Sequence, residues 1–237
     1  MKLSLIIPAY NEEKGIGKCL AAAVKHGAGK FKEIVVVDNA STDNTAAVAA
    51  SFPGVRVVRE DQKGTNFARQ RGVEETTSEL LAFLDADTLL RAGWIEKVER
   101  AFARDPKLVC LTGPYWFYDL PRHHAFAFWL NWHFAHITHF FTSAMGVTGN
   151  MVLRRSVLQN MGGFDTSYTF SGDDVDTALR ASKFGRVTFT FDIILDSSGR
   201  RYKKLGYFHT IGFYIQNAIR VIFDRPQKDS SNIESVR

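Results

Sequence analysis

The stretch EIVVVDNASTDNT, residues 33–45, decides the fold. Four β-branched apolar residues, 34–37, run without polar alternation, which predicts a strand with both faces buried. Asp38 follows at once, although a buried carboxylate is costly unless it is paired. Small polar residues at 41–43 then favour a helix start, because their oxygens can cap free backbone N–H groups. The stretch therefore predicts strand, polar turn and helix, with a carboxylate where parallel sheets bind ligands.

The same alternation extends on both sides of this unit. A strand pattern followed by a helix pattern recurs through the first half of the chain, which predicts βαβ units on a parallel sheet. The predicted strands are 3–10, 33–38, 54–60, 79–87 and 107–117, and the predicted helices are 13–27, 45–51, 64–76 and 92–105.

The pattern changes from about residue 120. Aromatic residues and histidines crowd into 122–146, and a strand with a short helix is predicted over 149–165. A helix over 172–185, a strand over 186–192 and a helix over 206–223 follow, the last with a polar side at Gln216, Asn217 and Arg220. The polar tail 224–237 is predicted to be disordered.

Composition limits the classes of partner. The chain has 237 residues, a net charge of +5 and a pI near 9.2, which favours nucleotides, phosphates or an acidic membrane face. This charge is too weak to indicate nucleic acid, and we recognise no RNA- or DNA-binding motif. Cys19 and Cys110 suggest no disulfide framework, so a reduced, cytoplasmic setting is expected. The first apolar run is too short for a signal peptide. The sequence contains no run of about 20 apolar residues, so we predict no membrane-spanning helix.

Three of the predicted strands end in polar residues, PAYNE, VDN and LDAD, which a parallel sheet would gather at one edge. Within LDAD, Asp85 and Asp87 are two residues apart and would point to the same side if extended geometry persisted. Adjacent carboxylates repel each other unless a cation or donors neutralise them, and oxygen ligands suit Mg²⁺ or Mn²⁺. The alternative is a pair of solvated turn aspartates.

Six segments together resemble a known family. LSLIIPAYNEE, EIVVVDNASTDNT, KGTNFARQRGVE, LDADT, GNMVLRRSVLQNMGGFD and GDDVDTALR occur in the order, and at about the spacing, of the inverting glycosyltransferases of family 2. The resemblance covers about residues 3–185. It implies a GT-A fold, a Rossmann-like, mainly parallel sheet flanked by helices, with acceptor-side helices near the C-terminus.

The resemblance also implies a nucleotide-sugar site. Asp38 would hydrogen-bond the base of the nucleotide, and Asp85 would lie near the ribose. The remaining residues implied to line or border the nucleotide-sugar are Pro8, Tyr10, Glu12, Lys63, Gly64, Arg69 and Asp173.

Metal and catalytic roles are implied in the same way. Asp87 would hold Mn²⁺ or Mg²⁺ on the diphosphate, and Asp174 matches the catalytic base. The family commonly has Glu-Asp where this chain has Asp173-Asp174, so the contact of the shorter Asp173 is the one in question. Some GT-A enzymes use a C-terminal histidine as a further metal ligand, which would be His209, although a histidine packed among aromatic residues is the alternative.

The implied reaction is chemically coherent. A metal stabilises a leaving diphosphate without a general acid, and a carboxylate on the opposite face of the sugar accepts the acceptor's proton. Attack opposite the leaving group inverts the anomeric centre. Asp174 opens a helix, whose positive end is expected to lower its pKa and keep it ionised. The alternative is an acidic first turn, as for Asp176, which is expected to pair with Arg180 four residues later.

Two further features allow more than one interpretation. His136 and His139 have metal-like spacing, but a surface or groove helix explains the histidines of 123–139 as well as zinc does. The basic run 200–204, followed by an aromatic helix, suits an anionic membrane surface, with 125–141 as a second contact. Alternatively both helices pack on the catalytic domain and Arg200 or Arg201 binds diphosphate. The membrane interpretation implies a lipid-linked sugar or a polyprenyl phosphate as acceptor.

We therefore predict a metal-dependent inverting glycosyltransferase that uses a nucleoside-diphosphate sugar, UDP-sugar before GDP-sugar, and a saccharide or lipid-linked acceptor. Residues 1–223 would form one domain, with 1–118 binding the donor and 119–223 facing the acceptor, followed by the tail 224–237. The expected location is cytoplasmic, including the inner face of the membrane. Two alternatives stay open, a sugar-phosphate nucleotidyltransferase and a non-catalytic nucleotide-sugar-binding scaffold. The first would need a Gly-rich, Arg-containing loop where this chain has PAYNEEKGIGK.

Overall fold

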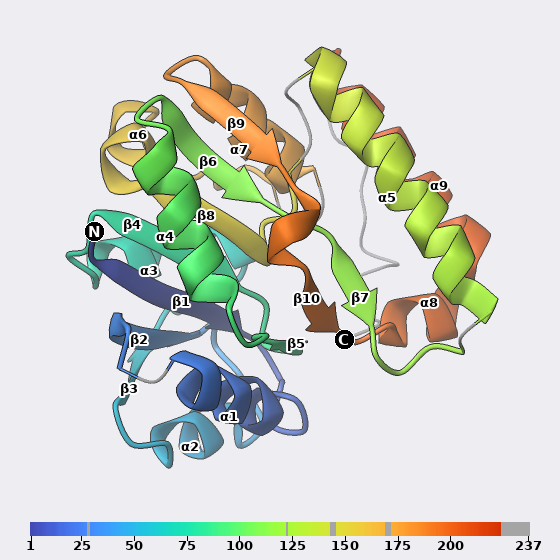
Figure 1. Cartoon of the computed structure of the whole chain (residues 1–237). Coiled ribbons are helices and arrows are strands. Elements are labelled where there is room, and N and C mark those ends of the chain that lie inside the picture. The colour runs from blue at the N-terminus through green and yellow to red at the C-terminus, as the bar shows by residue number, and fades with distance from the viewer. Residues whose placement is uncertain (28, 122, 143–145, 169–171, 224–237) are drawn as a thin grey trace.

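A mainly parallel sheet forms the centre of the computed structural model, which describes residues 1–27, 29–121, 123–142, 146–168 and 172–223 (Figure 1). In these residues seven strands pair in the order β3-β2-β1-β4-β8-β6-β9. Only β8 runs antiparallel to its neighbours, β4 and β6. The predicted α/β fold is thereby confirmed. The strands are β1 (Leu3–Ala9), β2 (Phe31–Asp38), β3 (Val55–Arg59), β4 (Leu80–Leu84), β6 (Leu108–Thr112), β8 (Asn150–Arg154) and β9 (Arg186–Phe189).

Helices cover both faces of this sheet, so the core has two layers. Helices α1 (Ile16–Gly27), α2 (Thr45–Ala50) and α4 (Trp94–Arg104) pack on one face. Helices α3 (Thr65–Glu74), α6 (Arg155–Asn160) and α7 (Asp173–Ser182) pack on the other.

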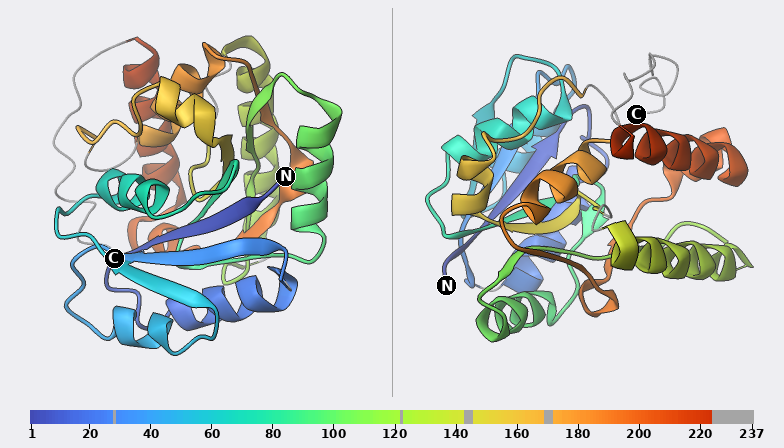
Figure 2. Two further views of the ribbon diagram at one scale, coloured as in Figure 1. Left: turned by 90° about the vertical axis from the view of Figure 1, so that its left-hand side faces the viewer. Right: turned by 90° about the horizontal axis from the view of Figure 1, so that it is seen from above.

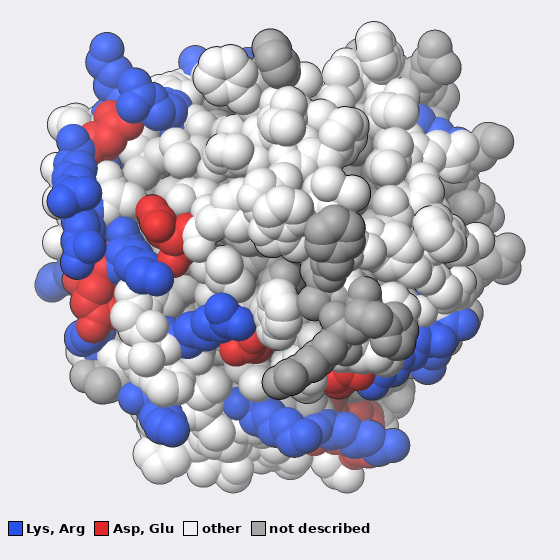
Figure 3. Space-filling model, turned by 45° about the vertical axis from the view of Figure 1, so that its right-hand side comes forward, with Lys and Arg blue, Asp and Glu red and all other residues white. Residues whose placement is uncertain are grey.

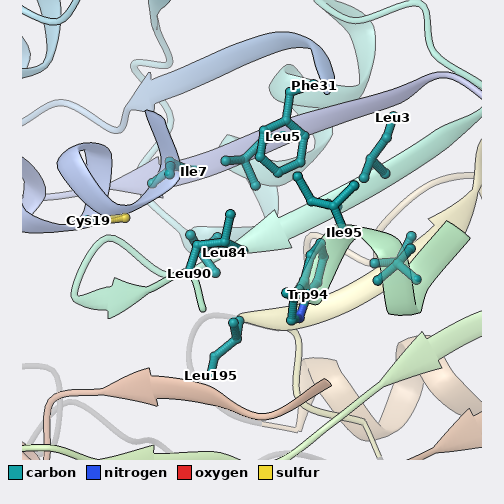
Figure 4. Close-up of a cluster of buried hydrophobic side chains, with 14 of the residues drawn as sticks. Leu3, Leu5, Ile7, Cys19, Phe31, Leu84, Leu90, Trp94, Ile95 and Leu195 are labelled. Atoms are coloured by element: carbon teal, nitrogen blue, oxygen red, sulfur yellow. The ribbon is translucent and has the colours of Figure 1, made fainter. Parts of the chain in front are cut away.

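Strand β1 shows why the strand sequences do not alternate. Leu5 and Ile7 enter the first apolar cluster, shown in Figure 4, whereas Ile6 enters the second. A strand buried on both faces needs apolar residues at every position, which is the pattern of residues 34–37 as well.

The predicted strand 107–117 is wrong as a single element. The chain leaves the main sheet after β6, and β7 (Tyr115–Phe117) joins β5 (Thr88–Leu89) and β10 (Leu195–Ser197) in a second, three-stranded sheet. Gly113 lies at the break, where a Cβ would come within 2.9 Å of the carbonyl oxygens of Thr190 and Ile193. Pro114 follows without an N–H group to continue the ladder.

Two long helices extend beyond the edge of the main sheet. α5 (His123–Thr142) and α9 (Tyr207–Ile222) run side by side, and seen from above they project in the same direction (Figure 2). Asn217 on α9 is buried, so the predicted polar side is not wholly exposed. The 3₁₀ turn Phe191–Ile193 and helix α8 (Arg200–Leu205) were not predicted from the sequence. The tail 224–237, predicted to be disordered, lies outside the described residues.

Both cysteines are buried and unpaired, Cys19 in α1 and Cys110 in β6. Within the described part of the chain, no helix combines the length and the apolarity that crossing a bilayer requires.

Candidate active site

The carboxyl ends of β1, β2 and β4 meet at one edge of the sheet, since these strands run parallel. A cavity of about 560 Å³ opens there. Most of the sequence-predicted site residues line it. They are Pro8, Tyr10, Glu12, Arg69, Asp85, Asp87, Asp173 and Asp174.

Four predicted residues do not line this cavity: Asp38, Lys63, Gly64 and His209. The first three lie close to it. The Lys63 ammonium group is 5.4 Å from the centre of the Tyr10 ring, and the Gly64 N–H donates to Asn39 Oδ1 at 2.8 Å. His209 is exposed on α9, and the structure does not bring it to the carboxylates.

Asp38 is buried at the tip of β2, directly before Asn39, which lines the cavity. Its Oδ2 is 3.5 Å from Arg59 Nη1, whereas Oδ1 has no hydrogen-bond partner among the described residues. Asn39 donates to the carbonyls of Glu60 and Gln62, at 3.2 and 2.7 Å, which fixes the loop leading to α3. A buried oxygen without a donor is unfavourable, so this position favours a ligand that brings an N–H group.

Asp85 and Asp87 are separated by a turn rather than by extended chain. The Thr88 N–H donates to the Asp85 carbonyl at 3.0 Å, so the extended geometry that would have placed both side chains on one side does not persist, although both line the cavity. Asp85 accepts a hydrogen bond from the Tyr115 hydroxyl at 3.1 Å and lies 3.6 Å from Arg69 Nη2.

The carboxylates of Asp87 and Glu12 share one counter-ion, the guanidinium of Arg200. Arg200 bridges the two, with Nη1 donating to Glu12 Oε2 at 2.9 Å and Nη2 lying 3.2 Å from Asp87 Oδ2. Burial raises the pKa of Asp87 to about 7; Arg200 lowers it, and the negative charges of Asp85 and Glu12 raise it further. Desolvation is thus the main cause of the raised pKa, and the neighbouring charges act on it in both directions.

Arg69 joins the strand tip to α7. This buried guanidinium donates through Nη1 to Asp173 and, at 3.0 Å, to Asn66, while Nη2 faces Asp85. The shorter Asp173 therefore has a defined partner in this chain. One cation links the carboxylates of β4 and α7 across the cavity.

Asp174 lies in the first turn of α7, after Gly172, and its Oδ1 accepts the Val175 N–H at 2.9 Å. The expected lowering of its pKa is wrong. Burial, followed by the charge of Asp173, raises the pKa of Asp174 to about 7, against the opposite effect of the Val175 N–H. Desolvation, the largest effect on this carboxyl, thus outweighs the helix end.

Two residues that shape the site, Gly149 and Asn150, have no role in the prediction from sequence. A Cβ at Gly149 would overlap with the Asp85 carboxylate and the Tyr115 hydroxyl, so only glycine fits there. Buried Asn150 accepts from Trp94 Nε1 at 3.1 Å and donates to the carbonyls of Pro114 and Ile193, at 3.3 and 2.7 Å. The only sequence signal was the pair Gly149-Asn150 ahead of a strand.

The basic run 200–204 divides between two surroundings. Arg200 and Arg201 line the cavity, and Arg201 donates to the hydroxyl of Tyr214. Lys203 and Lys204 are exposed, and Lys203 lies 3.2 Å from Asp119. The arginines thus belong to the candidate site and the lysines to the surface.

Two histidines of α5, His136 and His139, contact the segment 187–191. His139 is buried, with Nε2 3.1 Å from the Val187 carbonyl oxygen, and His136 lies near the rings of Phe189 and Phe191. Among the described residues, no group of three or more His, Cys, Asp or Glu side chains has the arrangement of a metal site.

Comparison with known proteins gives the same family as the sequence resemblance. The model of the family described as "Glycosyl transferase family 2" matches residues 4–162. Glycosyltransferase AglE of Haloferax volcanii is 30% identical over 204 residues, which cover 81% of this chain and 65% of AglE. The chain thus spans less than two thirds of that relative.

Solved structures of low sequence identity share the fold. Mannosyltransferase PcManGT from Pyrobaculum calidifontis, in complex with GDP-Man and Mn²⁺, has a TM-score of 0.72 at 20% identity, over 99% of this chain and 68% of that one. S. aureus TarS 1-349 in complex with UDP-GlcNAc has a TM-score of 0.68 at 17% identity, over 100% and 70%.

Proposed function

The chain belongs to glycosyl transferase family 2, and from that membership we propose that it transfers a sugar from a nucleoside-diphosphate sugar to an acceptor, with inversion and with a divalent metal. The acceptor group is a hydroxyl or a lipid phosphate. The family assignment argues against the nucleotidyltransferase alternative. The observation that carries the proposal is the convergence of Asp85, Asp87 and Asp174 on one cavity.

The donor lies at the tips of β1 and β2 in this proposal. Pro8, Tyr10 and Glu12 line the nucleoside pocket, and the unpartnered oxygen of Asp38 accepts an N–H group of the base. Uracil N3–H suits this oxygen, so a UDP-sugar is the first candidate, and guanine offers a similar donor for a GDP-sugar. Lys63, Gly64 and Arg69 border the nucleotide-sugar.

The residues at the cavity fit Mn²⁺ or Mg²⁺. Carboxylate oxygens are the ligands these cations prefer, and Asp87 lines the cavity together with the carboxylates of Asp85 and Glu12. The described residues offer no complete set of protein ligands, which agrees with a cation held by Asp87 together with substrate phosphates. When bound, the cation neutralises charge on the leaving diphosphate. His209 is not brought to this position, so we assign it no ligand role.

Asp174 supplies the base. For a hydroxyl acceptor, its carboxylate takes the proton as the oxygen attacks the anomeric carbon. The bond from that carbon to the diphosphate oxygen breaks, the diphosphate leaves with the electron pair, and the configuration inverts. Arg69 holds Asp173 beside the base, and Arg200 and Arg201 line the diphosphate side of the cavity.

We also propose the division of labour within the domain. Residues 1–118 carry the donor-binding tips, whereas 119–223 contribute Asp174 and the two projecting helices. The exposed side chains of those helices, including Phe140 and Phe208, support a role in contacting a membrane surface.

Ligand binding tests the proposal directly. We expect UDP with Mn²⁺, at about 100 times its Kd, to stabilise the protein by about 2.7 kcal/mol, which raises Tm by about 5 °C or more. The measurement is a thermal-shift series with UDP, GDP, ADP and CDP, each with Mn²⁺, Mg²⁺ or EDTA. The proposal fails if no nucleoside diphosphate shifts Tm in the presence of either metal.

The pKa of Asp174 predicts the pH dependence of turnover. Since the base must be ionised and its pKa is about 7, kcat/KM should rise with pH up to about 7 and level off above it. At pH 6 we expect about a tenfold lower value than on the plateau. The measurement is nucleoside diphosphate release from the donor at saturating Mn²⁺, between pH 5.5 and 8.5. A flat profile between pH 6 and 8 would contradict the role of Asp174.

A further inference from the structure

The cavity does not end at the carboxylates but continues as a groove between α5 and α9. One wall is formed by residues 131–142 of α5 and the other by residues 211–222 of α9. At a rise of 1.5 Å per residue, each wall is about 16 Å long. The wall residues recur at helical spacing. They are Asn131, Trp132, Phe134, Ala135, Thr138 and Thr142 on α5, and Ile211, Tyr214, Ile215, Ala218, Ile219 and Ile222 on α9.

This groove is apolar and open to the surface. Phe134 is 60% exposed, Ile215 46% and Ile219 47%, although all three line the same cavity as Asp174. Helix α5 contains no Lys, Arg, Asp or Glu, and α9 contains only Arg220. Figure 3 shows a broad area without such residues on this side of the molecule, with Lys and Arg along its lower margin. An exposed apolar surface of this extent marks a binding site.

The position of the groove identifies its occupant. A protein partner or a membrane surface would need only the outer faces of α5 and α9, whereas this groove leads to the base. An occupant that fills it therefore extends to the reacting centre, as part of the acceptor would. An acceptor that needs Asp174 carries a hydroxyl, because a phosphate nucleophile is already ionised. Lys204, exposed beside the start of α9, adds positive charge where an anionic headgroup region would lie.

We propose that the acceptor is a lipid-linked sugar whose hydrocarbon chain lies between α5 and α9. This inference rests on the proposed function. The sugar hydroxyl of the acceptor loses its proton to Asp174 as it attacks the anomeric carbon, and the donor diphosphate leaves with the electron pair of the broken bond. The lipid part takes no part in the bond changes. It supplies binding energy that places the hydroxyl.

A chain-length series tests the inference on the whole chain. The probes are ethyl and octyl glycosides of glucose, mannose and N-acetylglucosamine, kept below their micelle concentrations, with Kd measured by calorimetry in the presence of UDP and Mn²⁺. Burial of a methylene improves affinity roughly fourfold, so partial burial of six should favour octyl over ethyl by about 100-fold or more. If the octyl and ethyl glycosides bind with equal affinity while UDP binding is intact, the inference that the groove binds a hydrocarbon chain is wrong, and the proposed function still stands. Loss of UDP binding itself would instead count against the proposed function.

A matched pair of variants locates the effect. Ile215→Ser changes the groove wall, whereas Ile137→Ser changes an exposed residue of α5 that is not part of it. We expect the octyl preference to fall at least tenfold in Ile215→Ser and to persist in Ile137→Ser. A second groove variant, Ala218→Trp, fills the groove and should reduce the preference in the same way. If both groove variants keep the preference and lose only binding to phosphatidylglycerol vesicles, the helices serve membrane contact and the inference is wrong.

Discussion

Asp174→Asn is expected to reduce sugar transfer by about 10²–10⁴-fold while leaving UDP–Mn²⁺ binding nearly intact. The asparagine keeps the size of the side chain, and its carbonyl can still accept the Val175 N–H, but it cannot accept the acceptor's proton. The rise of kcat/KM with pH up to about 7 should also disappear, because the carboxyl group that titrates there is gone. The measurements are product formation, the UDP-induced Tm shift, and donor hydrolysis without acceptor.

Asp176→Asn is the matched control. It removes a charge from the same first turn, but Asp176 pairs with Arg180 at 3.3 Å and does not line the cavity. We expect it to alter stability slightly and turnover by less than about threefold. Equal losses in both variants would mean that charge in the turn, not a base at position 174, is what matters.

The second large effect is expected for Asp87→Ala, which should impair donor binding and transfer together. This change removes the carboxylate assigned to the cation and leaves Arg200 paired with Glu12 alone. Loss of several kcal/mol of charge stabilisation corresponds to about a 10³-fold reduction in kcat/KM. The Mn²⁺-dependent part of the UDP-induced Tm shift should also be lost.

Asp192→Ala is the corresponding control, because Asp192 is exposed and does not line the cavity. It should retain both the Tm shift and turnover. Turnover at the unaltered level in Asp87→Ala would contradict the assigned role and would favour a cation-independent reaction.

The central sheet and most of its helices were predictable from the sequence, because their signals are local. Strands such as β1 and β2 are buried on both faces and so contain uninterrupted apolar runs, and polar residues follow where each strand ends. The convergence of Tyr10, Asp85 and Asp174 on one cavity required only the rule that parallel strands end at one edge, together with the family resemblance.

The remaining features depend on contacts between distant segments, which no local pattern encodes. Strand β8 enters between β4 and β6 in the opposite direction, and this placement brings Gly149 against Asp85. Arg200 lies 188 residues from Glu12, so the sequence could not show their contact, although it allowed a diphosphate-binding role for Arg200 or Arg201. The pKa of Asp174 was predicted with the wrong sign because the helix terminus is visible in the sequence, whereas the desolvation of the side chain is not.

The guanidinium of Arg69 has a consequence for redesign of specificity. It is the common counter-ion of Asp85, which follows β4, and of Asp173, which lies beside the proposed base, so these two parts of the proposed site are not separate modules. A substitution chosen to accept a new donor at position 85 would also disturb the neighbour of the base at 173. Mutational libraries that randomise the two regions independently should therefore give non-additive results, and the outer groove walls offer the safer place to diversify.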